Sequence, residues 1–226
     1  SVPPRPAPVR VQVTGRGHRG WTDLPDWPPP SDPQQLYLQA DRRLGDRVPA
    51  ADAPPSTFRY DPADPTPTVG GRLLSRQAGY RDDAALADRE DVLAFTGAPL
   101  ASEIRVCGSP VVELEYACDI PHFDVFVRIS EIDARGRSRN VSDGFRRFST
   151  TPDRPVRLDL DPIAHRFGAG SRIRVLIGGG SHPRFARNLG TGEPAIGGSR
   201  MVASTHTVRH GERSRLILPV VQSLRP

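Results

Sequence analysis

The segment that comes nearest to a nucleophile motif is residues 179–183, G-G-S-H-P. The G-x-S-x-G elbow of serine hydrolases presents its serine on a strained turn between a strand and a helix. Here a proline stands where that pattern has its last glycine. Ser181 and His182 are direct neighbours, and neighbouring residues on a loop do not normally point at one another. The sequence therefore predicts no catalytic residue in this chain.

Histidines and paired acids could do chemistry as ligands of a metal ion. His206 and His210 would face one side of a strand, but about 13 Å of strand would separate them, which is too far for one ion. Asp159 and Asp161 lack the further oxygen ligands that calcium needs nearby. The histidines without a partner at ligand spacing are His18, His122 and His165. We expect neither a metal site nor a cofactor.

The charge pattern argues against a nucleic-acid partner. The formal charge is +5, and all 31 basic residues are arginines, interleaved with 26 acidic residues. A nucleic-acid surface would favour clustered basic residues. No run of four basic residues and no aromatic–basic motif occurs in this sequence. No window approaches the roughly 18 apolar residues of a membrane span, and the N-terminus lacks a secretory-signal layout. We expect a cytoplasmic protein with Cys107 and Cys118 as unpaired thiols.

A structured loop is predicted at residues 181–192, after an alternating strand at 172–177 and three glycines. Its mixture of turn-forming residues with Arg184, Phe185 and Asn188 is too ordered in character for a linker. We expect this loop to close one end of a β-sandwich.

Alternating apolar residues and turn signals about every ten residues predict an all-β fold. Parallel α/β architecture is excluded because the crossover helices are missing. We expect a two-sheet jelly-roll sandwich, with long proline-rich loops and at most one or two short helices, residues 81–88 being the plausible one. The expected strands are residues 9–13, 36–40, 57–60, 92–96, 104–107, 111–117, 123–132, 139–141, 156–160, 172–177, 205–208 and 215–221.

We expect one domain over residues 1–226, with an N-terminal strand and docking segment at 1–34 and the sandwich body at 35–226. Residues 15–33 are expected to be a long loop that carries Trp21 and Trp27 ahead of three prolines. Indole rings left in water forfeit several kcal/mol of burial. This segment is therefore expected to cover an apolar surface of another domain.

Five segments resemble a known family, and they run in order over nearly the whole chain. They are residues 61–71 (D-P-A-D-P-T-P-T-V-G-G), 89–96 (R-E-D-V-L-A-F-T), 123–125 with 139–144 (F-D-V and R-N-V-S-D-G), 183–188 (P-R-F-A-R-N) and 214–220 (S-R-L-I-L-P-V). This pattern is similar to the C-terminal domain of the cocaine esterase and X-prolyl dipeptidyl aminopeptidase family of α/β-hydrolases.

The resemblance implies a galactose-binding-like jelly roll without the catalytic triad, which the family carries on a preceding α/β-hydrolase domain. It implies a module that packs on that domain, in the same or a separate polypeptide, and helps wall the substrate cleft. Leu73, Leu74 and Ser75 match the family loop near the cleft, although Ser75 stands where an aromatic residue is common in the family. An equal alternative is that Leu73 and Leu74 are ordinary residues of the domain core. Whether the chain has any activity of its own stays open. The other function considered is a stand-alone carbohydrate- or ligand-binding module, and a homo-oligomer is possible.

Overall fold

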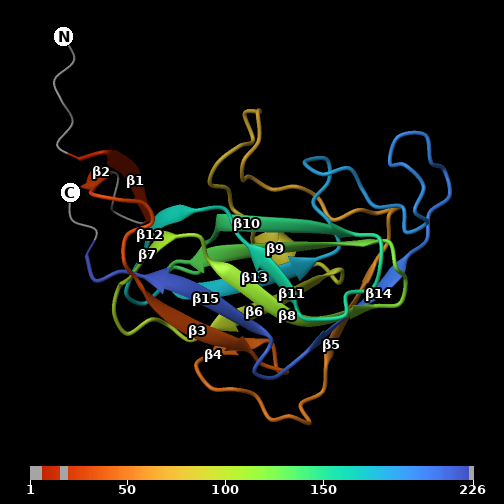
Figure 1. The fold of residues 1–226 in the computed structure, drawn as a ribbon, viewed down its shortest axis with the longest axis horizontal. Coiled ribbons are helices and arrows are strands. Elements are labelled where there is room, and N and C mark those ends of the chain that lie inside the picture. The colour runs from red at the N-terminus through yellow and green to blue at the C-terminus, as the bar shows by residue number, and fades with distance from the viewer. Residues whose placement is uncertain (1–6, 16–19, 224–226) are drawn as a thin grey trace.

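The computed structural model of the chain describes residues 7–15 and 20–223, and it confirms the predicted all-β class (Figure 1). A single four-residue helix, α1 (Ala84–Ala87), is named within these residues. The strands are β1 (Val9–Gly15), β2 (Gly20–Leu24), β3 (Asp32–Leu38), β4 (Arg43–Gly45), β5 (Ser56–Tyr60), β6 (Val92–Gly97), β7 (Ile104–Gly108), β8 (Val111–Cys118), β9 (Phe123–Ile132), β10 (Ser138–Phe148), β11 (Val156–Asp159), β12 (Ile163–Phe167), β13 (Arg172–Gly178), β14 (Ser204–Arg209) and β15 (Arg215–Val220).

The strands form one continuous hydrogen-bonded path that is folded over like a sandwich. The path runs β10-β9-β13-β6-β4-β3-β15-β7-β12-β1-β2, while β8 joins β15 and pairs with β11 and β14, and β14 pairs with β5. The pairs are antiparallel except β1 with β12 and β4 with β6. Strands from distant parts of the chain therefore meet, and the loops between them gather at the edges of the sandwich.

The main core lies between the two layers and is drawn from nearly every strand. On β8, Val112, Leu114 and Tyr116 are buried while Glu113 and Glu115 are half-buried, as the alternating sequence predicts. All ten residues of the central strand β9 are buried, because both of its faces are covered. Within the described ranges, no helix is long and apolar enough to cross a membrane.

The prediction of a continuous loop over residues 15–33 is wrong. β2 lies inside this segment and pairs with β1, with Val9 opposite Leu24 and Arg10 opposite Asp23. The Arg10 guanidinium donates to both Asp23 carboxylate oxygens at 2.7 and 2.9 Å. The glycine and prolines around this strand obscured its short alternation. Residues 16–19 lie outside the described residues.

The strand predicted at residues 139–141 is in fact much longer. β10 spans eleven residues and pairs with β9 from Ser138↔Ile132 to Phe148↔Phe123. Its central Ser142, Asp143 and Gly144 are buried, although polar and glycine residues usually indicate a turn. They are tolerated because Asp143 is directly opposite Arg128 of β9 and forms an ion pair with it.

Besides β2, two strands were not predicted, and both are short. β4 is three residues long and β12 is five residues long. The helix expected at residues 81–88 is shorter than expected, because α1 covers one turn only. Short elements carry too few periods of alternation to be distinguished from loop sequence.

Candidate functional site: a braced loop on one face of the sandwich

The loop of residues 71–79 projects from the sandwich as a closed hairpin (Figure 1). At its base the Gly71 amide donates to the Gly79 carbonyl at 2.9 Å, and the Gly79 amide donates back at 2.8 Å. Gly70, Gly71 and Gly79 have φ of 60°, 82° and 78°, a region that side chains disfavour. A Cβ on Gly71 would also lie 2.5 Å from a carboxylate oxygen of Asp143. Glycine at position 71 is therefore required for the loop to leave the sandwich here.

Side chains from the sheet brace both ends of this loop. Asn140 of β10 accepts from the Arg81 amide at 2.7 Å and donates to the Gly79 carbonyl at 3.1 Å. At the other end, the Arg72 guanidinium donates to Asp161 at 2.6 Å. The base of the loop is thus fixed to the sandwich, and its tip is held away from it.

A buried ion-pair network supports the braces from below. Arg128, whose side chain is fully buried, donates to Asp143 at 2.7 and 3.1 Å. Asp143 also accepts from Arg184 at 2.6 Å, and Arg184 lies 3.5 Å from Asp161. The second carboxylate near Arg128 is Asp83, at 3.7 Å. Paired charges of this kind fix positions because each would be costly to leave alone in the interior.

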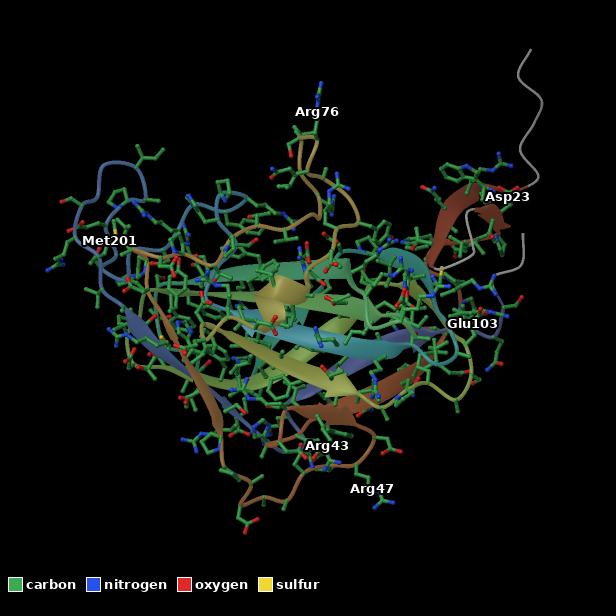
Figure 2. All side chains as sticks on the ribbon, turned by 180° about the vertical axis from the view of Figure 1, so that it is seen from behind. Asp23, Arg43, Arg47, Arg76, Glu103 and Met201 are labelled. Carbon is green, nitrogen blue, oxygen red and sulfur yellow. The ribbon has the colours of Figure 1, made fainter. Side chains whose placement is uncertain are left out.

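The three residues predicted to contribute to a cleft lie on this loop. Leu73 is half-buried, and Ser75 is exposed and accepts from the Gln77 amide at 3.2 Å. Leu74 is fully exposed, with a relative accessibility of 110%, so the alternative that it is a core residue is wrong. Figure 2 shows the neighbouring Arg76 at the tip of the loop. The loop therefore presents an apolar side chain to its surroundings and does not bury it in the sandwich.

The two tryptophans have different environments. Trp21 on β2 is 59% exposed. Trp27 is half-buried and packs on a small apolar cluster at the end of the sandwich. The buried members of that cluster are Val13, Leu24, Cys107, Ala164 and Val221. Trp21 is therefore available to another surface, whereas Trp27 contributes to the packing of its own chain.

The residues predicted to form a structured loop after β13 each have a defined contact. Phe185 stacks on Phe145 of β10 with ring centroids 3.9 Å apart, and the Arg184 guanidinium lies over the Phe185 ring. Asn188 donates to Asp124 of β9 at 2.9 Å. Arg184 thus joins this loop to the network beneath residues 71–79.

Three segments that project from the same side of the sandwich make up what we call the loop face: β2, residues 71–79 and residues 193–202. Figure 2 labels one residue in each: Arg76 projects at the top of the view, and Met201 and Asp23 lie in the upper half at the two opposite ends of the molecule. Each segment exposes large apolar side chains: Trp21 (59%) on β2, Leu74 (110%) on the 71–79 loop, and Ile196 (93%) with Met201 and Val202 in residues 193–202. Single exposed apolar side chains are common on protein surfaces, and only a contiguous apolar patch is typical of a surface that meets a partner.

A cleft of about 980 Å³ lies beside the base of the 71–79 loop, and a chain of polar groups lines it. The Tyr80 hydroxyl donates to Thr14 Oγ1 at 2.8 Å, and Thr14 Oγ1 lies 2.8 Å from Nδ1 of buried His165. Nε2 of His165 lies 3.1 Å from the Glu131 carboxylate. Burial, the largest single effect, raises the pKa of Glu131, but the interactions with His165 and the hydrogen bonds from Gly168 and Ser171 together lower it below its ordinary value. This series of hydrogen-bonded groups links β1, β9 and β12 to the loop. The sequence did not reveal it because the residues involved are far apart along the polypeptide.

Among the remaining sequence candidates for chemistry, Ser181, His206 and His210 have hydrogen-bond partners, whereas Nδ1 of His182 is buried without one in the residues that the structure describes. Ser181 is buried with its hydroxyl 3.0 Å from that of Thr68, and no hydrogen bond joins the Ser181 and His182 side chains among the described residues. His206 and His210 are buried and bond separate hydroxyl and carbonyl groups. Within the described part of the chain, no three His, Cys, Asp or Glu residues gather as metal ligands would.

Comparisons with known proteins agree with this arrangement. Residues 2–217 match the family described as the X-Pro dipeptidyl-peptidase C-terminal non-catalytic domain. Cocaine esterase from Rhodococcus sp. is 25% identical over 94% of this chain and 42% of its own length. A putative serine esterase from Mycobacterium bovis is 30% identical over 89% of this chain and 36% of its own length. The chain thus spans about two-fifths of these relatives.

Solved structures give the same picture. An aminopeptidase from the archaeon Thaumarchaeota archaeon superposes with a TM-score of 0.80 and 25% identity, covering 92% of this chain and 39% of its own. An α-amino acid ester hydrolase superposes with a TM-score of 0.80 and 25% identity, covering 95% of this chain and 41% of its own. With the family match extending over nearly its whole length, the chain belongs to the X-Pro dipeptidyl-peptidase C-terminal non-catalytic domain family.

Proposed function

We propose that this chain packs through its loop face against the α/β-hydrolase domain of a serine hydrolase and helps to wall the substrate cleft. The substrates proposed for the whole protein are esters, amides or Xaa-Pro peptides. The observation that carries the proposal is Leu74, held fully exposed at the end of a loop whose base is fixed to the sheet. Exposure of an apolar side chain to water is unfavourable, and its burial against a partner surface is favourable.

The size of the relatives supports this role. Cocaine esterase and the mycobacterial serine esterase are more than twice as long as this chain, which leaves room for a catalytic domain outside the matched region. Trp21 and Ile196 lie on the same face as Leu74 and would extend the contact on either side. The buried network of Arg128 and Asp143 would keep the 71–79 loop in place when the partner is bound.

We also propose that residues 1–226 form one domain of the jelly-roll, galactose-binding-like type and that the protein is cytoplasmic. One continuous strand path and one main core support the single domain. Cys107 and Cys118 are free thiols, as is usual in reducing compartments. The second candidate function is a stand-alone carbohydrate-binding module: Phe145 and Phe185 stack on each other, but the exposed ring of Trp21 on β2 would suit a sugar.

The test is Leu74→Ser in the whole hydrolase, with Val48→Ser as the matched control. Val48 is 51% exposed and follows Arg47, which lies on the opposite side of the molecule (Figure 2). Leu74→Ser should raise KM for p-nitrophenyl esters with apolar acyl groups several-fold and leave the melting temperature unchanged, while Val48→Ser should change neither. Equal kinetics for both variants and the parent would refute the cleft role.

A second experiment addresses catalysis by the chain itself. The 226-residue chain alone should not turn over p-nitrophenyl esters or Xaa-Pro anilides, because a hydroxyl at its ordinary pKa is a poor nucleophile. Turnover that survives purification and disappears in Ser181→Ala would overturn this expectation.

A further inference from the structure

Another pocket, of about 870 Å³, opens on the side of the sandwich opposite the loop face. Figure 2 places Arg43 and Arg47 on that side, away from Arg76 and Met201. The charged residues that line it are five arginines and one acid: Arg42, Arg43, Arg47, Arg172, Arg174 and Asp46. The residues that line this pocket therefore carry an excess of positive charge, part of which Asp41 offsets through its ion pair with Arg43.

Strand pairing brings these arginines together from distant parts of the chain. Thr96 of β6 has Arg43 of β4 as its register partner on one side. On its other side its partner is Arg174 of β13. The turn before β4 adds Arg42, so arginines from three elements line one pocket beside Thr96.

Two of these cations have no anionic partner. Arg43 pairs with Asp41, but neither Arg42 nor Arg174 forms a salt bridge among the described residues. Arg174 is half-buried and donates only to the Thr96 hydroxyl, at 3.0 Å. Arg42 lies over the ring of Phe95, 5.9 Å from its centroid. Withdrawing a cation from water is unfavourable, and burial lowers the pKa of both guanidinium groups. At Arg174 the charges of Asp83 and Asp88, which form no salt bridge with it among the described residues, oppose this effect only in part.

The backbone at Arg42 is also held in a disfavoured conformation. Arg42 has φ of 64°, and within the described residues it is the one non-glycine residue with positive φ. Such strain costs on the order of 1 kcal/mol and persists where the surrounding structure fixes it, often at binding sites. A glycine would fit this turn without the strain.

We propose that this arginine pocket binds a small oxyanion that carries several negative charges, of the polyphosphate or polycarboxylate type. Guanidinium groups recognise phosphate and carboxylate oxygens through paired hydrogen bonds. The volume is that of a small-molecule site. Among the described residues that line the pocket there is no aromatic side chain, whereas single-stranded nucleic acid is usually held by base stacking on such rings.

The test is calorimetric titration of the full chain with inorganic tripolyphosphate and with citrate at about 0.15 M salt, where long-range attraction is largely screened. One equivalent of either anion should bind; the tighter of the two identifies phosphate or carboxylate as the preferred group. Arg174→Gln and Arg42→Gly should each weaken binding about tenfold or more, the size expected for a lost charge-assisted hydrogen bond. Arg76→Gln on the loop face removes the same charge and should change the affinity less than twofold.

Arg42→Gly distinguishes the loss of a contact with the anion from a loss of folding, because glycine suits a positive φ and the substitution should not lower the melting temperature. Binding with unchanged affinity in both pocket variants would overturn the proposal. Equal weakening by Arg76→Gln, or affinity for heparin that grows with chain length, would show a general attraction of polyanions and would also overturn it.

Discussion

Lowering the pH from 7 to 4.5 should destabilise the folded chain through His206, a histidine held neutral inside the core. His206 is fully buried on β14, with Nδ1 2.6 Å from the Tyr116 hydroxyl and Nε2 2.8 Å from the Ser204 hydroxyl. Its ring stacks on Phe58 at 4.6 Å between centroids. Burial lowers the pKa of His206 to about 4, against a slight opposing effect of Asp119. A proton on this ring would thus be costly in the folded state.

The sign and size of this pH effect follow from the difference in the pKa of His206 between the unfolded and the folded chain. The unfolded chain takes up a proton at His206 below pH 6.5, whereas the folded chain does so only below about 4. Between these values the unfolded state binds more protons, so stability falls as the pH falls. Each pH unit in this window is worth about 1.4 kcal/mol, which gives a loss of about 2.5 kcal/mol between pH 7 and 4.5.

Urea unfolding at pH 7 and pH 4.5 measures this loss. Other groups also titrate in this range, so the contribution of His206 is the difference between the parent and His206→Gln, whose loss should be smaller by about 2.5 kcal/mol. His122→Gln is the matched control, because His122 is only half-buried, and it should retain the parent's loss. The same pH dependence in parent and His206→Gln would refute the reasoning, whatever the stability of the variant at pH 7.

Three further substitutions test the packing described above. Trp27→Ala should lower the free energy of unfolding by about 2 kcal/mol, which is less than for a fully buried tryptophan. Trp21→Ala should change the free energy of unfolding by no more than about 0.5 kcal/mol. Equal melting temperatures for the two variants would contradict the different environments of the two tryptophans. Asp143→Ala leaves the buried Arg128 without its closest partner and should cost about 3–5 kcal/mol, measured by chemical unfolding, and a cost below about 1 kcal/mol would contradict a tightly coupled pair.

Strands with regular alternation could be predicted from the sequence. β8 and β9 were predicted within a residue of their observed ends, because apolar residues at every second position indicate a face that enters the core. β10 could not be bounded in this way, since its centre is polar. Its Asp143 is stable inside only because Arg128 lies directly opposite on β9, and that pairing depends on a register that the sequence does not reveal.

The loop residues of the candidate site could be identified from family resemblance, but their environments could not. Leu74 and Trp27 are both apolar residues in proline- or glycine-rich segments, yet Leu74 is fully exposed and Trp27 packs on a local cluster. The arginine pocket likewise could not be identified from the sequence. Arg42 and Arg174 are far apart in sequence among ordinary charged residues, and only the strands beside Thr96 bring them together.

Hydrogen–deuterium exchange of the chain, alone and with the α/β-hydrolase domain proposed as its partner, tests the central claim most directly. Amides in residues 20–24, 71–79 and 193–202 should become protected in the presence of that domain, because these segments make up the loop face. Residues 39–47, beside the arginine pocket, should exchange as they do in the chain alone. Protection at 39–47 without protection at 71–79, or no protection anywhere, would contradict docking through the loop face.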